Sequence, residues 1–571
     1  MADESGLNPF VFACQGGLVL DQSTFAMQPG MALELENFEP ATTGGYRRIS
    51  GYNKWNANIV PQDQSDSEPV LMSAHFDGNV IAARGRKVYK GSNGSTTLSS
   101  AINNSVTTIP VASTTNFSTQ GTLIIGTEQI TYTGKTSTTF TGCTRGANSS
   151  SAAAHSDAAV VTQFWTEIDT GRTGAGRYSF FRYNLAGVDY IIWADGANHA
   201  AKYRTASNAV TDITASGAPA DPRFVTGYKN HMFFAGMSAG TQSLVFTAPF
   251  TDNDFQTGQG AGTINVDSPI TGLFPFRDAL IIFCEERIFK LTGNALADFA
   301  IQPVTREIGC LNGSTIQEFA GDLVFLGPDG LRTVAGTAKI GDVELGTISR
   351  AVQKRFEGLS DVDEFTSIVI PDKTQYRIFF GNSQTPRATT KGTICVRKGD
   401  AYEFADLRGI RPNCTDNVVV AGESIVIHGD FDGFVYRQEQ GQDFDGNTIT
   451  GKYRSPDLTM GDAGLRKSFQ RVIINYAPEA AVNADLFVRY DYEAPNTARP
   501  AAYPFDSSTV VAVYGSSTYG TATYGGQSNP LVRQPIEGSG FAVALRVNDR
   551  GTSAPYALKG FQLEFAADAR R

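Results

Sequence analysis

The sequence predicts an all-β protein built around a β-propeller. Residues that favour strands and turns are abundant, with 37 Phe, 21 Tyr and 59 Gly among 571 residues, and only 18% of the chain is charged. Many segments alternate apolar and polar residues, which is typical of strands with one buried face. Helical periodicity is scarce, and the best candidates are the short stretch 348–356 and the residues around Val362. The length is sufficient for about two to four domains.

A two-strand pattern recurs through the middle of the chain: an apolar strand, a tight turn, and a second strand that often ends in Tyr or Phe beside a basic residue. Its five clear copies lie at 79–90, 189–204, 280–291, 323–334 and 425–437, and two weaker ones at 232–234 and 376–380. The turn centres are Gly196, Gly236, Glu286, Gly330, Gly381 and Gly433, with Gly78 joining them if residues 96–163 are set aside. They recur roughly every 40–50 residues, the repeat length of four-stranded propeller blades. We therefore expect about seven blades; the alternative is a set of unrelated hairpins in sandwiches.

The segment 96–163 interrupts this repeat and reads as a small inserted β-module. Its edges are rich in Ser and Thr, and a small core is expected from Leu123, Ile125, Ile130, Tyr132 and Phe140. Loops lie on protein surfaces and tolerate insertions. We therefore expect the module to project outward as a peripheral contact module.

These patterns divide the chain into four parts. An N-terminal segment, 1–50, packs on the terminal β domain; a propeller comprises 51–95 and 164–451; the inserted module is 96–163; and a C-terminal β-sandwich spans 452–571. Within the last part, a Tyr-Gly pair repeats every five residues from Tyr514 to Gly525. We interpret it as a loop, with either an interface or packing on its own domain as its role.

Charge and cysteine usage exclude several classes of protein. The net charge is −10 and no run of five or six basic residues occurs, so sequence-specific nucleic-acid binding is not expected. No apolar run approaches the ~20 residues of a membrane span, and the first five residues do not resemble a secretory signal, so assembly in a cytoplasm is expected. The cysteines are predicted to be free, buried thiols rather than a disulfide framework or metal site, and lie at positions 14, 143, 284, 310, 395 and 414.

No catalytic motif is present, and we predict no catalytic, cofactor-binding or metal-binding residues and no cofactor. The histidines, at 75, 155, 199, 231 and 428, lack metal-ligand spacing. Asp195, Asp329 and Asp432 lie in turns where a propeller glycosidase could place carboxylates. Tight hairpin turns also require such residues, and we favour the turn interpretation. The stretch 443–447 is a poor match to a calcium loop and is expected to be a surface loop.

One polar trio stands out in the inserted module. Glu128, Arg145 and His155 are the charged or titratable side chains that could converge there. A carboxylate paired with a guanidinium is more often a structural clamp than a reactive site. We therefore predict a clamp.

The two ends of the chain carry the motifs of a family resemblance. The N-terminal ones are Gly16-Gly17-Leu18, Leu35 to Pro40 and Gly44 to Tyr52, and the C-terminal ones are Ser468 to Tyr476, Gly538 to Val547 and Ala554 to Phe565. Together they resemble the tail-nozzle, or tail-stabilisation, proteins of short-tailed bacteriophages. The resemblance implies a structural virion protein without catalytic activity.

The same resemblance implies a homohexameric ring around the DNA exit channel. The ring would lie below the portal and adaptor proteins and support tail fibres or tailspikes, and genomic DNA would pass without sequence-specific binding. Arg47, Arg48 and Arg466 are candidates for lining a narrow constriction. The alternative function is a carbohydrate-binding or carbohydrate-cleaving propeller acting in receptor recognition.

Overall fold

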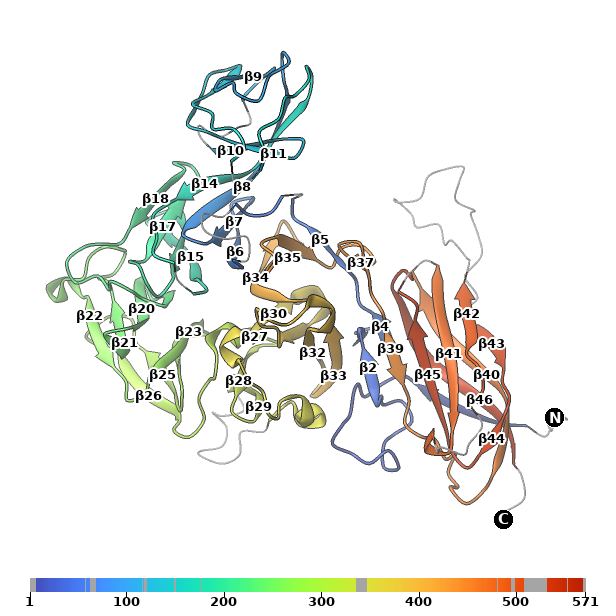
Figure 1. Cartoon of the computed structure of the whole chain (residues 1–571). Helices are drawn as coiled ribbons and strands as arrows, with labels where there is room; N and C mark the ends of the chain where they lie inside the picture. Colours follow the sequence, from blue (N-terminus) through green and yellow to red (C-terminus); the bar gives the residue numbers. More distant parts are fainter. Residues whose placement is uncertain are drawn as a thin grey trace.

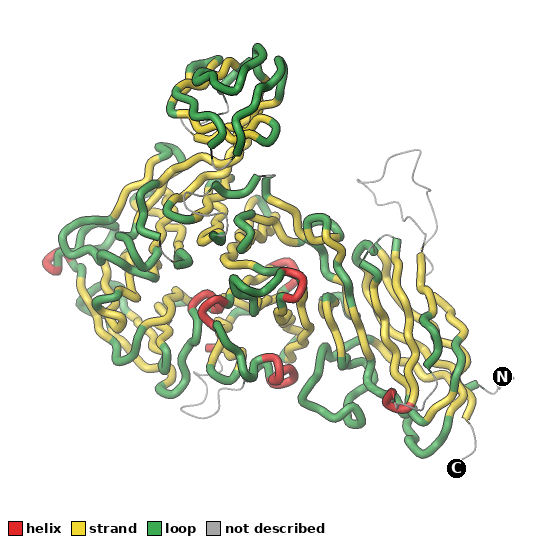
Figure 2. The backbone as a smooth tube through the Cα atoms, viewed as in Figure 1, coloured by secondary structure: helices red, strands yellow, loops and turns green. Residues whose placement is uncertain are grey.

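The computed structural model confirms the all-β fold class, with a propeller, a projecting module and a β-sandwich (Figure 1). It describes residues 7–56, 58–61, 68–115, 117, 121–147, 150–174, 176–334, 347–479, 481–493, 499–507, 531–551 and 553–567. Strands dominate throughout, and the few helical turns are short (Figure 2). Two of these turns, η3 (Arg350–Arg355) and η4 (Val362–Glu364), coincide with the two helix candidates but are 3₁₀ turns.

Seven sheets surround the propeller axis, and the first strand of each lies innermost, in contact with its neighbours around the ring. The first blade contains β6 (Val70–Phe76), β7 (Asn79–Arg84), β8 (Lys87–Thr97) and β14 (Val160–Asp169), and the second contains β15 (Ser179–Leu185), β16 (Val188–Ala194), β17 (Ala201–Arg204) and β18 (Ala209–Asp212). The third contains β19 (Phe224–Tyr228), β20 (His231–Met237), β21 (Gly240–Phe246) and β22 (Gly262–Asn265), and the fourth contains β23 (Ile270–Phe276), β24 (Ala279–Cys284), β25 (Ile288–Thr292) and β26 (Ala300–Thr305). The fifth blade contains β27 (Gln317–Phe319), β28 (Asp322–Gly327) and β29 (Gly330–Thr333). The sixth contains β30 (Thr366–Ile370), β31 (Gln375–Phe379), β32 (Lys391–Lys398) and β33 (Ala401–Arg408). The seventh contains β34 (Pro412–Val420), β35 (Glu423–Asp430), β36 (Val435–Gln438) and β5 (Tyr52–Lys54).

The five clear hairpins of the sequence pattern are the second and third strands of five blades. The second strands are buried over most of their length, because one face packs on the preceding blade and the other on the next. Two turn centres are placed differently from the expectation. Gly78 joins the first and second strands of its blade, so its counterpart is Gly85, and Gly236 lies inside β20 at a bulge with φ +75°.

The last blade closes the ring with a strand from the N-terminal part of the chain. Strand β5 pairs antiparallel with β36, and Tyr52 lies opposite Gln438. The Tyr52 ring is fully buried against His428, Tyr436 and Phe444, with ring centroids 4.9–5.1 Å away. Closure thus joins segments almost four hundred residues apart and buries a large aromatic cluster.

The inserted module grows out of the first blade. Strands β8 and β14 extend beyond the blade, and β14 continues the sheet into β10 (Gly121–Ile125) and β11 (Glu128–Tyr132). A second small sheet contains β12 (Gly134–Lys135), β13 (Thr139–Thr141) and β9 (Ile109–Pro110). All five predicted core residues belong to a hydrophobic cluster that is separate from those of the blades. Figure 1 shows the module projecting away from the propeller.

The sandwich consists of two packed sheets and includes N-terminal strands. One sheet contains β1 (Asn8–Ala13), β3 (Phe38–Pro40), β4 (Tyr46–Arg48), β40 (Lys467–Pro478), β43 (Leu531–Pro535), β44 (Ser539–Gly540) and β46 (Tyr556–Ala567). The other contains β39 (Lys452–Arg454), β45 (Val543–Asp549), β41 (Val482–Tyr490) and β42 (Tyr503–Ser507). A short hairpin of β37 (Asp443–Phe444) and β38 (Asn447–Thr448) precedes it, where the surface loop was expected.

A single strand joins the sandwich to the propeller. Strand β2 (Glu34–Glu36) pairs with β33 of the sixth blade on one side and with β39 of the sandwich on the other, which makes one continuous nine-stranded sheet. One hydrophobic cluster likewise runs from the fifth, sixth and seventh blades into the sandwich. We call the region around β2 to β5 the joint. Because sheet and core both continue through it, the joint holds the two parts in a fixed relation.

Candidate functional site

A cavity lies at one end of the central channel of the propeller, which the innermost strands surround. We call it the channel-mouth cavity. It has a volume of about 960 Å³. Every blade contributes a residue from the beginning of its innermost strand: Leu71, Ser179, Phe224, Ile270, Gln317, Thr366 and Asn413. Cavities of roughly 300–1,000 Å³ are typical of small-molecule sites.

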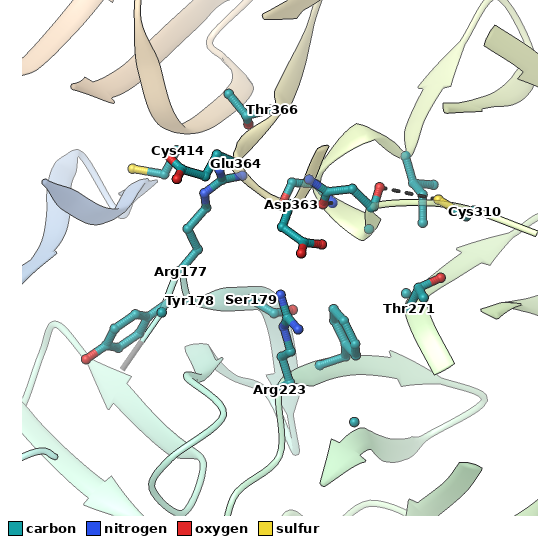
Figure 3. A pocket seen from close by; sticks show the side chains of 18 of the residues that line it. Arg177, Tyr178, Ser179, Arg223, Thr271, Cys310, Asp363, Glu364, Thr366 and Cys414 are labelled. Carbon is teal, nitrogen blue, oxygen red and sulfur yellow. Dashed lines mark hydrogen bonds between the residues drawn. The ribbon is translucent and has the colours of Figure 1, made fainter. Parts of the chain in front are cut away.

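Five charged side chains line this cavity, and four of them come from the segments that lead into the innermost strands. Arg177 precedes β15, Arg223 precedes β19, and Asp363 and Glu364 precede β30, while Glu285 follows β24. Figure 3 shows Arg223 and Asp363 pointing toward one another, with Arg177 extending toward Glu364. No hydrogen bond or ion pair occupies the side chain of Arg223 or Asp363 within the described residues.

Arg177 connects the start of the second blade to the sixth and seventh blades. Its Nε donates to the Asn413 side chain of the seventh blade (3.0 Å), and its Nη1 donates to the Phe365 carbonyl before the sixth blade (2.6 Å). Both acceptors are neutral, so burial dominates and lowers the pKa of the Arg177 guanidinium to about 10. The side chain remains cationic at neutral pH and forms one wall of the cavity.

The sequence did not single out these charged residues, because none belongs to a motif. Their common feature is their place immediately before an innermost strand. Aligning the blades at the start of their innermost strands could have identified these residues.

The aspartates considered for a glycosidase do not meet. Asp195 accepts hydrogen bonds from the backbone of Ala197 (3.0 Å) and Asn198 (2.8 Å), as a turn residue does. Asp329 and Asp432 are paired with arginines: Asp329 with Arg332, Asp432 with Arg387 and Arg411. None of the three lines the cavity. Turn chemistry and ion pairing therefore account for all three.

Glu128, Arg145 and His155 do meet, as a buried clamp. The Glu128 carboxylate accepts from Arg145 Nε (2.8 Å) and Nη2 (2.7 Å) and from the backbone of Gly146 and Ala153 (both 3.1 Å). His155 Nε2 lies 2.7 Å from the same carboxylate. Although burial opposes ionisation, these contacts together lower the pKa of Glu128 to about 2. Every acceptor position is occupied, which fits a structural role.

The expectation that Arg48 lines a constriction is wrong. Its side chain is fully buried in the joint, where it pairs with Asp549 at 3.4 Å and donates to the carbonyls of Gln442 and Ile449. Arg47 pairs with Glu39 and Glu479, and Arg466 donates to Ser539. The two arginines of the N-terminal motif therefore hold the joint together.

The remaining candidates are placed as follows. All six cysteines are free and buried, as predicted. The described residues contain no group of His, Cys, Asp and Glu arranged to hold a metal ion. Over the same ranges, no helix has the length and apolar character needed to cross a membrane. The Tyr-Gly repeat at 514–525 lies outside the described residues.

Comparison with known proteins gives remote structural matches. No protein-family model matches the chain, and no curated protein is significantly similar to it. One similar solved structure is an ancestral GH74 enzyme, with 9% identity, 64% of this chain and 56% of that one covered, and a TM-score of 0.34. Another is the extracellular domain of a putative one-component system from B. thetaiotaomicron, with 9% identity, coverage of 74% and 43%, and a TM-score of 0.27. A third is an exo-β-1,3-galactanase from Phanerochaete chrysosporium, with 9% identity, coverage of 69% and 97%, and a TM-score of 0.24. The chain thus matches little more than half the length of the GH74 enzyme. At 9% identity such likeness carries no information about activity.

Proposed function

We propose that this chain is a structural virion protein, a subunit of the tail nozzle of a short-tailed bacteriophage. In this role it is assembled in the host cytoplasm and forms a ring, a hexamer by the family resemblance, around the DNA exit channel. Its neighbours are the portal or adaptor ring and the tail fibres or spikes. DNA passes through the ring without sequence-specific binding.

One observation carries the proposal. The motifs that resemble the tail-nozzle family are separated by four hundred residues, yet they converge on the joint and the sandwich sheet beside it. There, Gly45 lies so close to the Leu558 carbonyl that a Cβ would come within 2.4 Å of it, and at Gly51 a Cβ would come within 1.7 Å of the Asp443 carbonyl. These glycines are required for close packing of the backbone. This close packing supports a scaffold role for the motifs.

A buried ionic network in the joint supports the same role. Glu39, from the N-terminal motif, accepts from Arg47 (3.1 Å), Lys373 (2.6 Å) and Arg377 (3.1 Å). Arg377 also pairs with Glu439 at 2.7 Å. Buried charges are sensitive to geometry and are costly to leave unpaired. The network therefore favours one arrangement of sandwich and propeller, which is consistent with a structural subunit.

The proposal is tested by quantitative mass spectrometry of purified particles of the virus that encodes the chain. We expect the chain in mature particles at about six copies, since rings close with a fixed number of subunits. Its presence only in the lysate of infected cells, and not in particles, would refute the structural role.

A second candidate is carbohydrate recognition at the host surface, and the channel-mouth cavity favours it. Its lining combines cationic, anionic and aromatic side chains, which together suit a polar ligand. A tail subunit that contacts its host could fulfil both roles. Retention of the purified chain on immobilised host polysaccharide tests this candidate.

A further inference from the structure

We infer that the channel-mouth cavity binds an uncharged saccharide, held between Arg223 and Asp363. This inference rests on the second candidate function, carbohydrate recognition, and specifies its site and the class of ligand. The structural role in the tail does not depend on it.

The charges in the cavity select against ions of either sign. Two guanidinium groups, of Arg177 and Arg223, face the three carboxylates of Glu285, Asp363 and Glu364. An anionic ligand would meet the carboxylates, and a cationic ligand would meet the guanidinium groups. A neutral ligand with many hydroxyl groups avoids both penalties, because each hydroxyl can donate one hydrogen bond and accept another.

The open hydrogen-bonding groups match such a ligand. The side chains of Arg223 and Asp363 have no hydrogen-bond or ion-pair partner among the described residues, and they point toward one another (Figure 3). The guanidinium offers donors only and the ionised carboxylate offers acceptors only. Hydroxyl groups of one ligand can therefore serve both, one accepting from Arg223 and another donating to Asp363.

The rest of the wall is held in place before any ligand arrives. Arg177 is anchored to Asn413 and to the Phe365 carbonyl, and one Glu364 oxygen accepts from the Ser383 backbone at 2.8 Å. The Arg223 guanidinium lies over the Phe224 ring, 5.7 Å from its centroid. Side chains held in this way lose little entropy on binding. The cavity therefore combines a fixed frame with two unoccupied, complementary groups.

The test measures saccharide binding to the full-length chain by saturation-transfer NMR and calorimetry. The probes are neutral glucose, galactose and xylose oligosaccharides, with an oligoglucuronate and a chitosan oligomer as charged comparators. The cavity variants are Arg223→Gln and Asp363→Asn. The controls are Arg277→Gln and Asp278→Asn at the other end of β23, where Arg277 lies over the Phe276 ring in the same way, 4.9 Å from its centroid.

We expect at least one neutral probe to bind, with affinity reduced about tenfold or more in each cavity variant, because each loses a hydrogen bond to a charged group. Both controls should bind as the wild type does, and all variants should unfold at wild-type temperature. Saccharide binding that survives both cavity substitutions would overturn this site while leaving carbohydrate recognition in place. Preference for a charged comparator would overturn the ligand class. No binding of any probe would overturn the inference and the second candidate function together.

Discussion

Replacing Glu128 with Gln is expected to loosen the inserted module and leave the propeller intact. The substitution keeps the shape of the side chain and removes its charge. Arg145, whose side chain is only 6% exposed, is then left as a buried cation without its counter-charge. Breaking a buried pair in this way costs about 3–5 kcal/mol.

The pKa of Glu128 gives an independent magnitude. A carboxyl pKa lowered from 4.5 to about 2 corresponds to about 3 kcal/mol of stability at neutral pH. Because the folded-state pKa is lowered, this contribution is complete above about pH 4.5. It is lost as pH falls from there toward 2.

Hydrogen exchange read by mass spectrometry measures the effect. A loss of about 3 kcal/mol should speed exchange in residues 121–147 by about a hundredfold, with the second to fourth blades unchanged. Glu423→Gln is the control, because Glu423 is 67% exposed in its pair with Arg437 and its loss should cost less than about 1 kcal/mol. Unaltered exchange in the module of the Glu128 variant, or equal acceleration in the blades, would refute this reasoning.

Three further predictions concern the whole chain. Deletion of Thr96 to Gln163 with a short Gly/Ser link should leave a folded propeller, because Gly94 pairs with Gln163 and the two new ends, Ser95 and Phe164, therefore lie on neighbouring strands. Loss of the remaining β signal in circular dichroism would show that the segment belongs to the core. Burial raises the pKa of the thiols, to about 11 for Cys414 and about 12 for Cys310. The cysteines should therefore react with an aromatic disulfide reagent only when the chain unfolds. Rapid reaction of the native protein at neutral pH would contradict this. The free chain should not bind duplex DNA at physiological salt in an anisotropy titration. Non-specific binding, with dissociation constants of roughly 10⁻⁴–10⁻⁶ M, needs clustered basic residues. Micromolar binding that weakens steeply with salt would instead indicate that the fold assembles a basic surface that holds DNA.

The parts of the fold that depend on local pattern could be predicted from the sequence. The hairpins of five blades stand out because their second strands are apolar runs covered on both faces, and the module core is compact in sequence. The sequence pattern could not predict that β5 closes the ring or that β2 joins the propeller to the sandwich. Strands of three residues are too short to show a periodicity. Gly78 was assigned to the wrong turn because Gly78 and Gly85 both follow a buried, largely apolar strand.

The candidate site could be predicted only in part. The clamp at Glu128 and the turn role of Asp195 follow from residue types and were anticipated. Arg223 and Asp363 belong to no motif, and they line one cavity only because the blades are arranged in a ring. Arg48 was expected at a surface because arginine is seldom buried, and the carboxylate that compensates it, Asp549, lies five hundred residues away.

Electron cryomicroscopy of the tail of purified particles tests the structural role most directly. The account predicts a ring of subunits around the channel axis, each with a propeller and a sandwich in the relation fixed by the joint, and with the module of residues 96–163 projecting from the first blade. A tail map at sufficient resolution that contains no density for this propeller would contradict the account.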